Sequence, residues 1–203
     1  LVIDLRGNPG GYLQAATSIA DELISGEKLL VYTKGKSFER QDYNAHQTGL
    51  FERGNLCILI DQYSASASEI LAGAVQDWDR GTIVGRTSFG KGLVQEQFDL
   101  KDGSALRLTV ARYYTPSGRC IQRAYTEGIE KYYNEADERY LHGDTVELDS
   151  SAITDTTIYK TSKGKRVYGG GGIRPDVFVP VDTSEGNEYF VLLSSLLREF
   201  ASR

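Results

Sequence analysis

Two short stretches of the sequence carry residue types that could do chemistry. "GRTSFGKG", Gly85 to Gly92, sets Lys91 in a glycine-rich turn. "DQYSASASEI" places small residues and serines between an apolar segment and a helical pattern. The first stretch reads G-x-x-x-x-G-K, one residue short of a phosphate-binding P-loop. Lys91 could therefore bind a phosphate or take part in different chemistry.

A nucleotide site is disfavoured at Lys91. A P-loop needs a strand before the glycines, a Ser or Thr after the lysine for magnesium, and a helix that begins at the lysine. "GTIVG" supplies the strand, but Gly92 follows the lysine and "LVQEQFDL" is typical of a strand. We therefore expect no nucleotide there, and a lone lysine in such a turn would ordinarily be a solvated surface residue.

The serines offer a different interpretation of Lys91. A turn from a buried strand into a helix presents a serine at a helix N-terminus, with backbone N–H groups nearby that can bind an oxyanion. A single serine there is usually a simple N-cap. Together, the two motifs suggest a serine nucleophile with a lysine base. His46 and His142 lie in polar segments far from both motifs, so we expect them at the surface.

The surrounding elements alternate between strand and helix. Apolar runs and helical spacing predict four strands and two helices, at 1–4, 28–34, 55–61 and 81–86 and at 12–23 and 67–78. Two further strands, 91–100 and 104–115, form a predicted hairpin around Asp102-Gly103. Residues 35–54 are polar and are expected to be irregular. The order of elements indicates an α/β fold with crossover connections.

The second half of the chain has a different character. Residues 124–167 are rich in tyrosine and acidic residues and weakly periodic, so we interpret them as an insertion. We prefer a surface arm over a regulatory element as the interpretation of this insertion. "YGGGGIRPDVFVP", residues 168–180, indicates a turn followed by a strand. Residues 187–200 predict a closing amphipathic helix.

Composition argues against several classes of protein. The chain has 203 residues, a net charge of −5 and no basic stripe, which argues against a nucleic-acid partner. No apolar run approaches the roughly 18 residues of a membrane span. Cys57 and Cys120 do not define a compartment, and we expect no disulfide between them. The sequence opens on the predicted strand "LVIDLR" without a visible targeting signal, so we expect a fragment of a larger protein.

Five segments resemble one known family in their order and approximate spacing. They are "DLRGNPGG", "SASASEILAGAVQD", "IVGRTSFGKGLVQ", "LTVARYYTPSGR" and "GGIRPDVFVP". They resemble the C-terminal processing, or tail-specific, serine peptidases over residues 1–123 and 168–181. The resemblance implies a crotonase/ClpP-like α/β core of mixed sheet and crossover helices, here with the tyrosine-rich insertion. The family's PDZ domain has no counterpart in the chain, so we expect residues 1–203 to be a peptidase core fragment.

The resemblance also implies roles for individual residues. Ser66, the middle serine of "SASAS", is the implied nucleophile, and Lys91 is the implied general base. Gln95 corresponds to the residue that positions the lysine. An ordinary lysine, with a pKa of about 10.4, is neutral in only about one molecule in a thousand near pH 7.4. We therefore expect apolar neighbours such as Phe89 and Leu93 to favour the neutral amine of Lys91.

The implied oxyanion hole uses two backbone N–H groups. One belongs to Ala67 and the other to Gly11, with Gly10 as the near alternative. Glu69 and Asp77 lie on the same predicted helix and are expected to be structural or to face solvent. No metal or cofactor is implied.

The implied activity is that of a serine endopeptidase that cleaves proteins near their C-termini through an acyl-enzyme. The implied partners are polypeptide substrates, an oligomer is compatible, and the implied location is the periplasmic side of a bacterial cell envelope. The alternative is a non-catalytic ligand- or peptide-binding module of the same fold. The presence of both Ser66 and Lys91 argues against that alternative.

Overall fold

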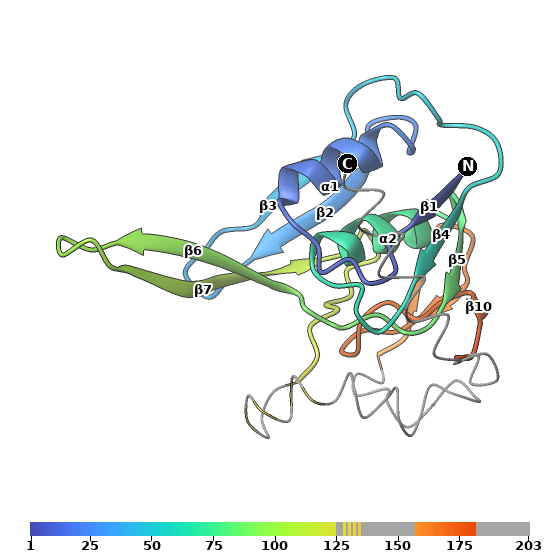
Figure 1. The fold of residues 1–203 in the computed structure, drawn as a ribbon. Helices are drawn as coiled ribbons and strands as arrows, with labels where there is room; N and C mark the ends of the chain where they lie inside the picture. The colour runs from blue at the N-terminus through green and yellow to red at the C-terminus, as the bar shows by residue number, and fades with distance from the viewer. Residues whose placement is uncertain (125–127, 129, 131, 133, 135–156, 182–203) are drawn as a thin grey trace, which may run out of the picture.

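Two four-stranded sheets and two helices dominate the part of the protein that the computed structural model describes, residues 1–124, 157–181, 128, 130, 132 and 134 (Figure 1). The first sheet is parallel, with the order β1 (Val2–Asp4), β4 (Cys57–Ile60), β5 (Thr82–Gly85), β10 (Val177–Phe178). The second is antiparallel, with the order β3 (Gln41–Asn44), β2 (Leu29–Lys34), β7 (Ala105–Tyr114), β6 (Leu93–Asp99). A small pair joins β8 (Tyr159–Lys160) to β9 (Arg166–Val167).

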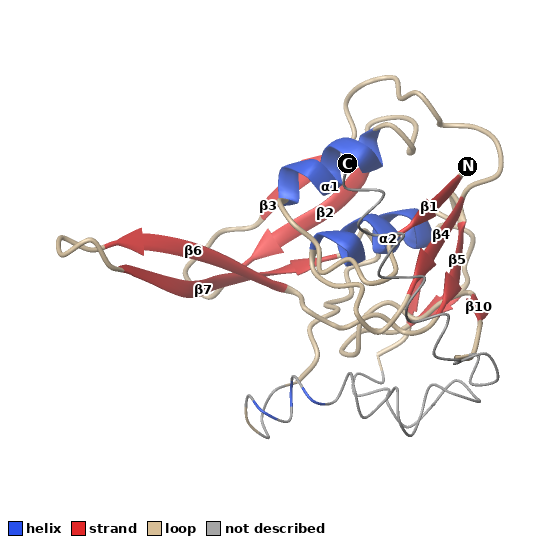
Figure 2. Ribbon diagram, in the orientation of Figure 1, coloured by secondary structure: helices blue, strands red, loops and turns tan. Residues whose placement is uncertain are grey.

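The helix α2 (Ala67–Asp77) is the central element of the fold. It connects β4 to the parallel neighbour β5, and α1 (Leu13–Asp21) packs against it (Figure 2). All of its residues are buried, among them Ile70, Leu71 and Val75. A helix that is buried on every side needs packing neighbours on every side. Its two ends are therefore fixed within the core, and the polar groups at those ends are fixed with them.

Most of the elements predicted within the described residues are confirmed. The strands at 1–4, 28–34, 55–61 and 81–86 and both helices occur within a few residues of their predicted ends. The expectation that residues 35–54 are irregular is wrong at β3, which pairs with β2. Its sequence "QDYN" shows no apolar alternation because β3 is an edge strand that exposes most of its side chains.

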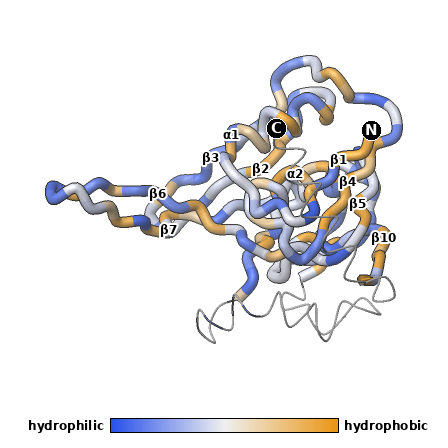
Figure 3. Tube along the Cα trace, in the orientation of Figure 1, coloured by the Kyte–Doolittle hydropathy of each residue, from blue (hydrophilic) through white to orange (hydrophobic). Residues whose placement is uncertain are grey.

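The hairpin of β6 and β7 extends away from the helices (Figure 1). Its turn contains Asp102-Gly103 as predicted, and Gly103 has a φ of 86°, which favours glycine. Figure 3 shows that its far tip is hydrophilic, whereas apolar segments gather in the strands near α2. The base of the hairpin is anchored in the core, where Tyr113 is buried.

The later part of the chain is described in pieces. The strand expected after the glycine run is present as β10, parallel to β5. The strands β8 and β9 lie within the segment 124–167 that was interpreted as an insertion. The closing helix expected at 187–200 and His142 lie outside the described residues. Among the described residues, no helix has the length and apolar character needed to cross a membrane.

Candidate active site

Ser66 occupies a strained position at the start of α2. It is the N-cap residue, with a φ of 59°, a backbone region that residues other than glycine rarely adopt. Gly10 lies tightly against it. A Cβ atom on Gly10 would stand 2.6 Å from the nitrogen of Ala67 and 2.8 Å from the Cβ of Ser66. Small residues on both sides therefore permit the close approach that turns Ser66 into the pocket.

The two flanking serines are engaged in the structure. Ser64 is fully buried and donates its hydroxyl to the carbonyl of Leu5 at 2.8 Å. Ser68 donates its hydroxyl to the carbonyl of Asn8 at 3.1 Å. The two hydrogen bonds connect the N-terminal part of α2 and the turn before it to the residues that follow β1. Of the three serines, only Ser66 lines the pocket described next.

One pocket, with a volume of about 390 Å³, brings together the residues expected as nucleophile, base, positioning residue and oxyanion-hole donors, whereas Gly10 and Phe89 do not line it. Its lining includes these five residues: Gly11, Ser66, Ala67, Lys91 and Gln95. The hairpin of β6 and β7 contributes Arg107 and Tyr113 to the same pocket. Elements far apart in sequence therefore converge where the N-terminus of α2 meets the base of the hairpin.

Two backbone donors in this pocket are open. Within the described part of the chain, neither the N–H of Ala67 nor that of Gly11 has a hydrogen-bond partner. The N–H of Gly10 donates to Oδ1 of Asn8 at 2.9 Å. The geometry thus favours Gly11 over Gly10 as the second donor, and the helix N-terminus adds favourable potential for an anion.

Lys91 lies in the loop between β5 and β6. Its backbone N–H donates to Oε2 of Glu69 at 2.9 Å. Leu93 lines the pocket beside it, as expected. In the residues that the structure describes, the Lys91 amine forms no hydrogen bond with Ser66 or with Gln95, which is exposed in β6. The ring of Phe89 packs edge-on against Tyr132, with 5.4 Å between the ring centroids.

Glu69 is a buried carboxylate that joins the two motifs. It accepts the N–H of Ser66 at 2.8 Å, and on the loop it accepts the N–H of Gly90 at 2.7 Å and the Ser88 hydroxyl at 2.5 Å. Its side chain is fully buried, so of the two expectations for Glu69, structural or solvent-facing, the structure bears out the first. Burial raises its pKa, an effect that these donors oppose. The S-x-x-E spacing of a capping box is the sequence signal that could have revealed it.

Tyr113 is the second site residue that sequence reasoning missed. Its hydroxyl lies 3.2 Å from Oγ of Ser66 and also hydrogen bonds to the carbonyl of Lys91. No pattern in the sequence marks it, because Tyr113 and Tyr114 are adjacent in one strand. Only the register of β7 decides which of the two rings turns to the pocket.

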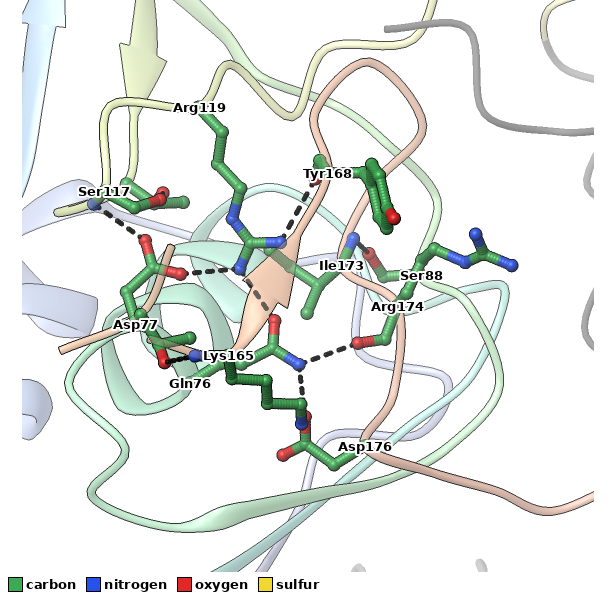
Figure 4. A network of polar contacts seen from close by, with 12 residues as sticks. Gln76, Asp77, Ser88, Ser117, Arg119, Lys165, Tyr168, Ile173, Arg174 and Asp176 are labelled. Carbon is green, nitrogen blue, oxygen red and sulfur yellow. Dashed lines mark hydrogen bonds and ion pairs between the residues drawn. The ribbon is translucent and has the colours of Figure 1, made fainter. Parts of the chain in front are cut away.

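The opposite end of α2 is closed by an ionic network (Figure 4). Asp77 and Arg119 form an ion pair of 2.8 Å, and each side chain is only 1% exposed. Asp77 is thus structural, one of the two expectations for it. Arg119 also donates to Gln76, whose amide donates to the carbonyl of Arg174 at 2.8 Å.

The same segment that meets this network also reaches the lysine loop. The N–H of Ile173 donates to the hydroxyl of Ser88 at 2.6 Å (Figure 4). Ser88 in turn donates to Glu69. Residues 168–176 therefore join the C-terminal end of α2 to the loop that carries Lys91.

The other polar candidates lie away from the pocket. His46 is 78% exposed in its side chain and contacts Asp21 at 2.9 Å, as expected of a surface residue. Both cysteines are free. Across the described ranges, no group of three or more His, Cys, Asp and Glu side chains could bind a metal ion.

Comparison with known proteins gives one consistent family. The model of peptidase family S41 matches residues 1–134. The chain is 45% identical over 122 residues to a carboxyl-terminal-processing protease of Synechocystis sp., covering 60% of this chain and 28% of that protein. It is 49% identical over 121 residues to a carboxy-terminal-processing protease of Bartonella bacilliformis, again with 60% and 28% coverage.

A solved structure shares the fold as well. The photosystem II D1 C-terminal processing protease matches with a TM-score of 0.62 and 30% identity, over 89% of this chain and 34% of that one. The chain spans little more than a quarter, 28%, of the length of the first curated relatives that it matches.

Proposed function

The chain belongs to peptidase family S41, a family of serine-type peptidases, and we propose that it is the catalytic core of an endopeptidase that cleaves proteins near their C-termini. The observation that carries this proposal is the convergence of Ser66 and Lys91 in one pocket, beside two open backbone N–H groups. We also assign the two-sheet core to the crotonase/ClpP-like class, with residues 1–203 as a peptidase core.

The proposed reaction begins with Ser66 and Lys91. The neutral amine of Lys91 accepts the proton of the Ser66 hydroxyl, directly or as the pocket closes around substrate. Oγ of Ser66 attacks the scissile carbonyl carbon, and a tetrahedral intermediate forms. Gln95, at the start of the hairpin and in the same pocket, positions the amine of Lys91 once substrate is bound.

The developing negative charge falls on the carbonyl oxygen. The N–H groups of Ala67 and Gly11 donate to it, which needs no rearrangement because neither has a hydrogen-bond partner among the residues that the structure describes. The protonated Lys91 then donates to the leaving amine, and the acyl-enzyme on Ser66 remains. A water molecule, deprotonated by Lys91, attacks the acyl carbon, the ester bond to Oγ breaks, and Lys91 returns the proton to Ser66.

The substrates that we propose are polypeptides cut close to their C-terminal ends, since the relatives are named for carboxyl-terminal processing. No nucleic acid partner is proposed for a chain of net charge −5. We propose a location on the periplasmic side of a bacterial cell envelope, and an oligomer is compatible with the activity.

Covalent labelling of the full-length protein with a fluorophosphonate probe tests the proposal. We expect one labelled residue, Ser66, when the adduct is mapped by mass spectrometry. Cleavage products of a model protein should have new ends close to the original C-terminus. A protein that binds peptides but neither reacts with the probe nor cleaves would instead be the non-catalytic module.

A further inference from the structure

Tyr113 links the two motifs of the proposed dyad through a single hydroxyl group. Its backbone N–H donates to the carbonyl of Gly92 at 3.1 Å, which fixes β7 beside the lysine loop. Tyr113 is 5% exposed. The hydroxyl reaches Oγ of Ser66 at 3.2 Å and the carbonyl of Lys91. No other described side chain hydrogen bonds with the Ser66 hydroxyl.

The donors and acceptors of this cluster fix the direction of its hydrogen bonds. A phenol has one proton, and a backbone carbonyl can only accept. The phenolic proton of Tyr113 is therefore donated to the carbonyl of Lys91. The same hydroxyl is the donor toward Oγ of Ser66, so the phenolic proton is shared between the two oxygens.

Tyr113 is not suited to be the base itself. Burial raises its pKa, and the nearby charge of Glu69 raises it further. The phenol thus stays protonated at every pH at which a peptidase would work. Its hydroxyl contacts Oγ of Ser66 without removing the serine proton.

We propose, on the premise that Ser66 and Lys91 form the catalytic dyad, that Tyr113 is the positioning residue of that dyad. Its hydroxyl fixes the position of Oγ of Ser66 relative to the backbone carbonyl of Lys91. In the resting protein Oγ of Ser66 accepts from the Tyr113 hydroxyl. In the reaction the Ser66 proton passes to the Lys91 amine, and the Tyr113 hydroxyl keeps its bond to the Lys91 carbonyl.

The substitution Tyr113→Phe, made in the full-length enzyme, tests this role. Removing a hydrogen bond that orients the nucleophile should lower kcat roughly tenfold with little change in KM. The rate of labelling by a fluorophosphonate should fall by a similar factor. The pH at which activity rises should stay unchanged, since Tyr113 is not the base.

The neighbouring tyrosine supplies a matched control. Tyr114 lies in the same strand, but its ring stacks on Tyr32 at 4.8 Å, and it does not line the pocket. Tyr114→Phe should retain the kcat of the wild type. Equal kcat and labelling rates in Tyr113→Phe and the wild type would overturn the inference. An inactive, unlabelled wild type would overturn the proposed function instead.

A double-mutant cycle keeps the inference testable if Tyr113→Phe is poorly folded. In denaturant unfolding, Tyr113→Phe should lower the midpoint less in a Ser66→Ala background than in the wild type, because the shared hydrogen bond is already absent. Equal shifts in both backgrounds would show that Ser66 and Tyr113 do not interact, and the inference would fail.

Discussion

Both ends of α2 contain polar groups, but the two ends arrange these groups differently. At the C-terminal end, Asp77 and Arg119 form an ion pair that is almost fully buried, and Gln76 completes its hydrogen bonds. At the N-terminal end, Ser66 has a positive φ and the N–H of Ala67 has no partner among the described residues. One end is closed, and the other is open toward a pocket.

The difference indicates which end is built for stability and which for binding. Strain and unengaged donors persist only where the surrounding structure fixes them. The closed end supplies that support, since residues 168–176 connect its network to Ser88 and through Ser88 to Glu69. Substitutions at the open end should therefore change activity far more than stability, and substitutions at the closed end should do the reverse.

The largest effect is expected at Ser66. Ser66→Ala should lower the turnover by a factor of about 10⁴ or more, because the nucleophile is removed. Its free energy of unfolding should change little. Ser64→Ala and Ser68→Ala are the controls, since their hydroxyls bind carbonyls of the turn after β1. These variants should keep measurable cleavage, although loss of the buried Ser64 hydroxyl costs stability. Activity that survives in Ser66→Ala and disappears in Ser68→Ala would assign the nucleophile elsewhere.

A comparable loss is expected when Lys91 is replaced. Lys91→Arg should be as damaging as Lys91→Ala, because a guanidinium does not give up its proton. In the wild type, the peptidase rate should rise with pH through the neutral range. The control is Lys165→Arg at the closed end, where the lysine pairs with Asp176 and only its charge matters. A flat pH profile from 5 to 9 would rule out Lys91 as the base.

The next effect belongs to the closed end. Arg119→Met leaves Asp77 buried without its partner, which typically costs about 3–5 kcal/mol in the free energy of unfolding. Arg40→Met removes a pair with Asp42 that is exposed to solvent, so it should cost much less. Denaturant unfolding measures both. Folded Arg119→Met should still react with the serine probe, and a variant that is stable but unreactive would contradict the division between the two ends.

The sequence predicts the open end better than the closed one. The helix 67–78 and the strand before it are strongly patterned, so Ser66 could be placed at their junction. Small residues such as Gly10 mark the close approach. The partners of Asp77 could not be foreseen, because Arg119 lies 42 residues away and nothing local pairs them. The strand β3 was missed since its edge position tolerates polar residues, and Tyr113 was missed because strand register, not composition, turns it inward.

The smallest effect is expected at Glu69, which contacts Ser66 at the open end and is connected to residues 168–176 through Ser88. Glu69→Gln keeps the shape but presents an amide to donors on Ser66, Ser88 and Gly90. A mismatched buried group costs about 1–3 kcal/mol in the free energy of unfolding. The rate of probe labelling should also fall, since Glu69 fixes the backbone of Lys91. Glu96→Gln, at an exposed position of β6, is the matched control and should leave both quantities unchanged.

The pH dependence of the stability difference between the wild type and Glu69→Gln tests whether burial or the surrounding donors dominate the pKa of Glu69. Burial raises its pKa in the folded protein above the ordinary 4.5. At a pH between the pKa of Glu69 in the unfolded chain and its raised pKa in the folded protein, the folded protein retains a proton that the unfolded chain has released. The stabilising contribution of the carboxyl group is therefore complete at low pH and declines as pH rises through that window. Because Glu69→Gln does not titrate there, the stability advantage of the wild type over this variant should shrink from pH 4 to pH 8. An advantage that grows with pH would mean that the surrounding donors outweigh burial and that Glu69 is anchored as a carboxylate.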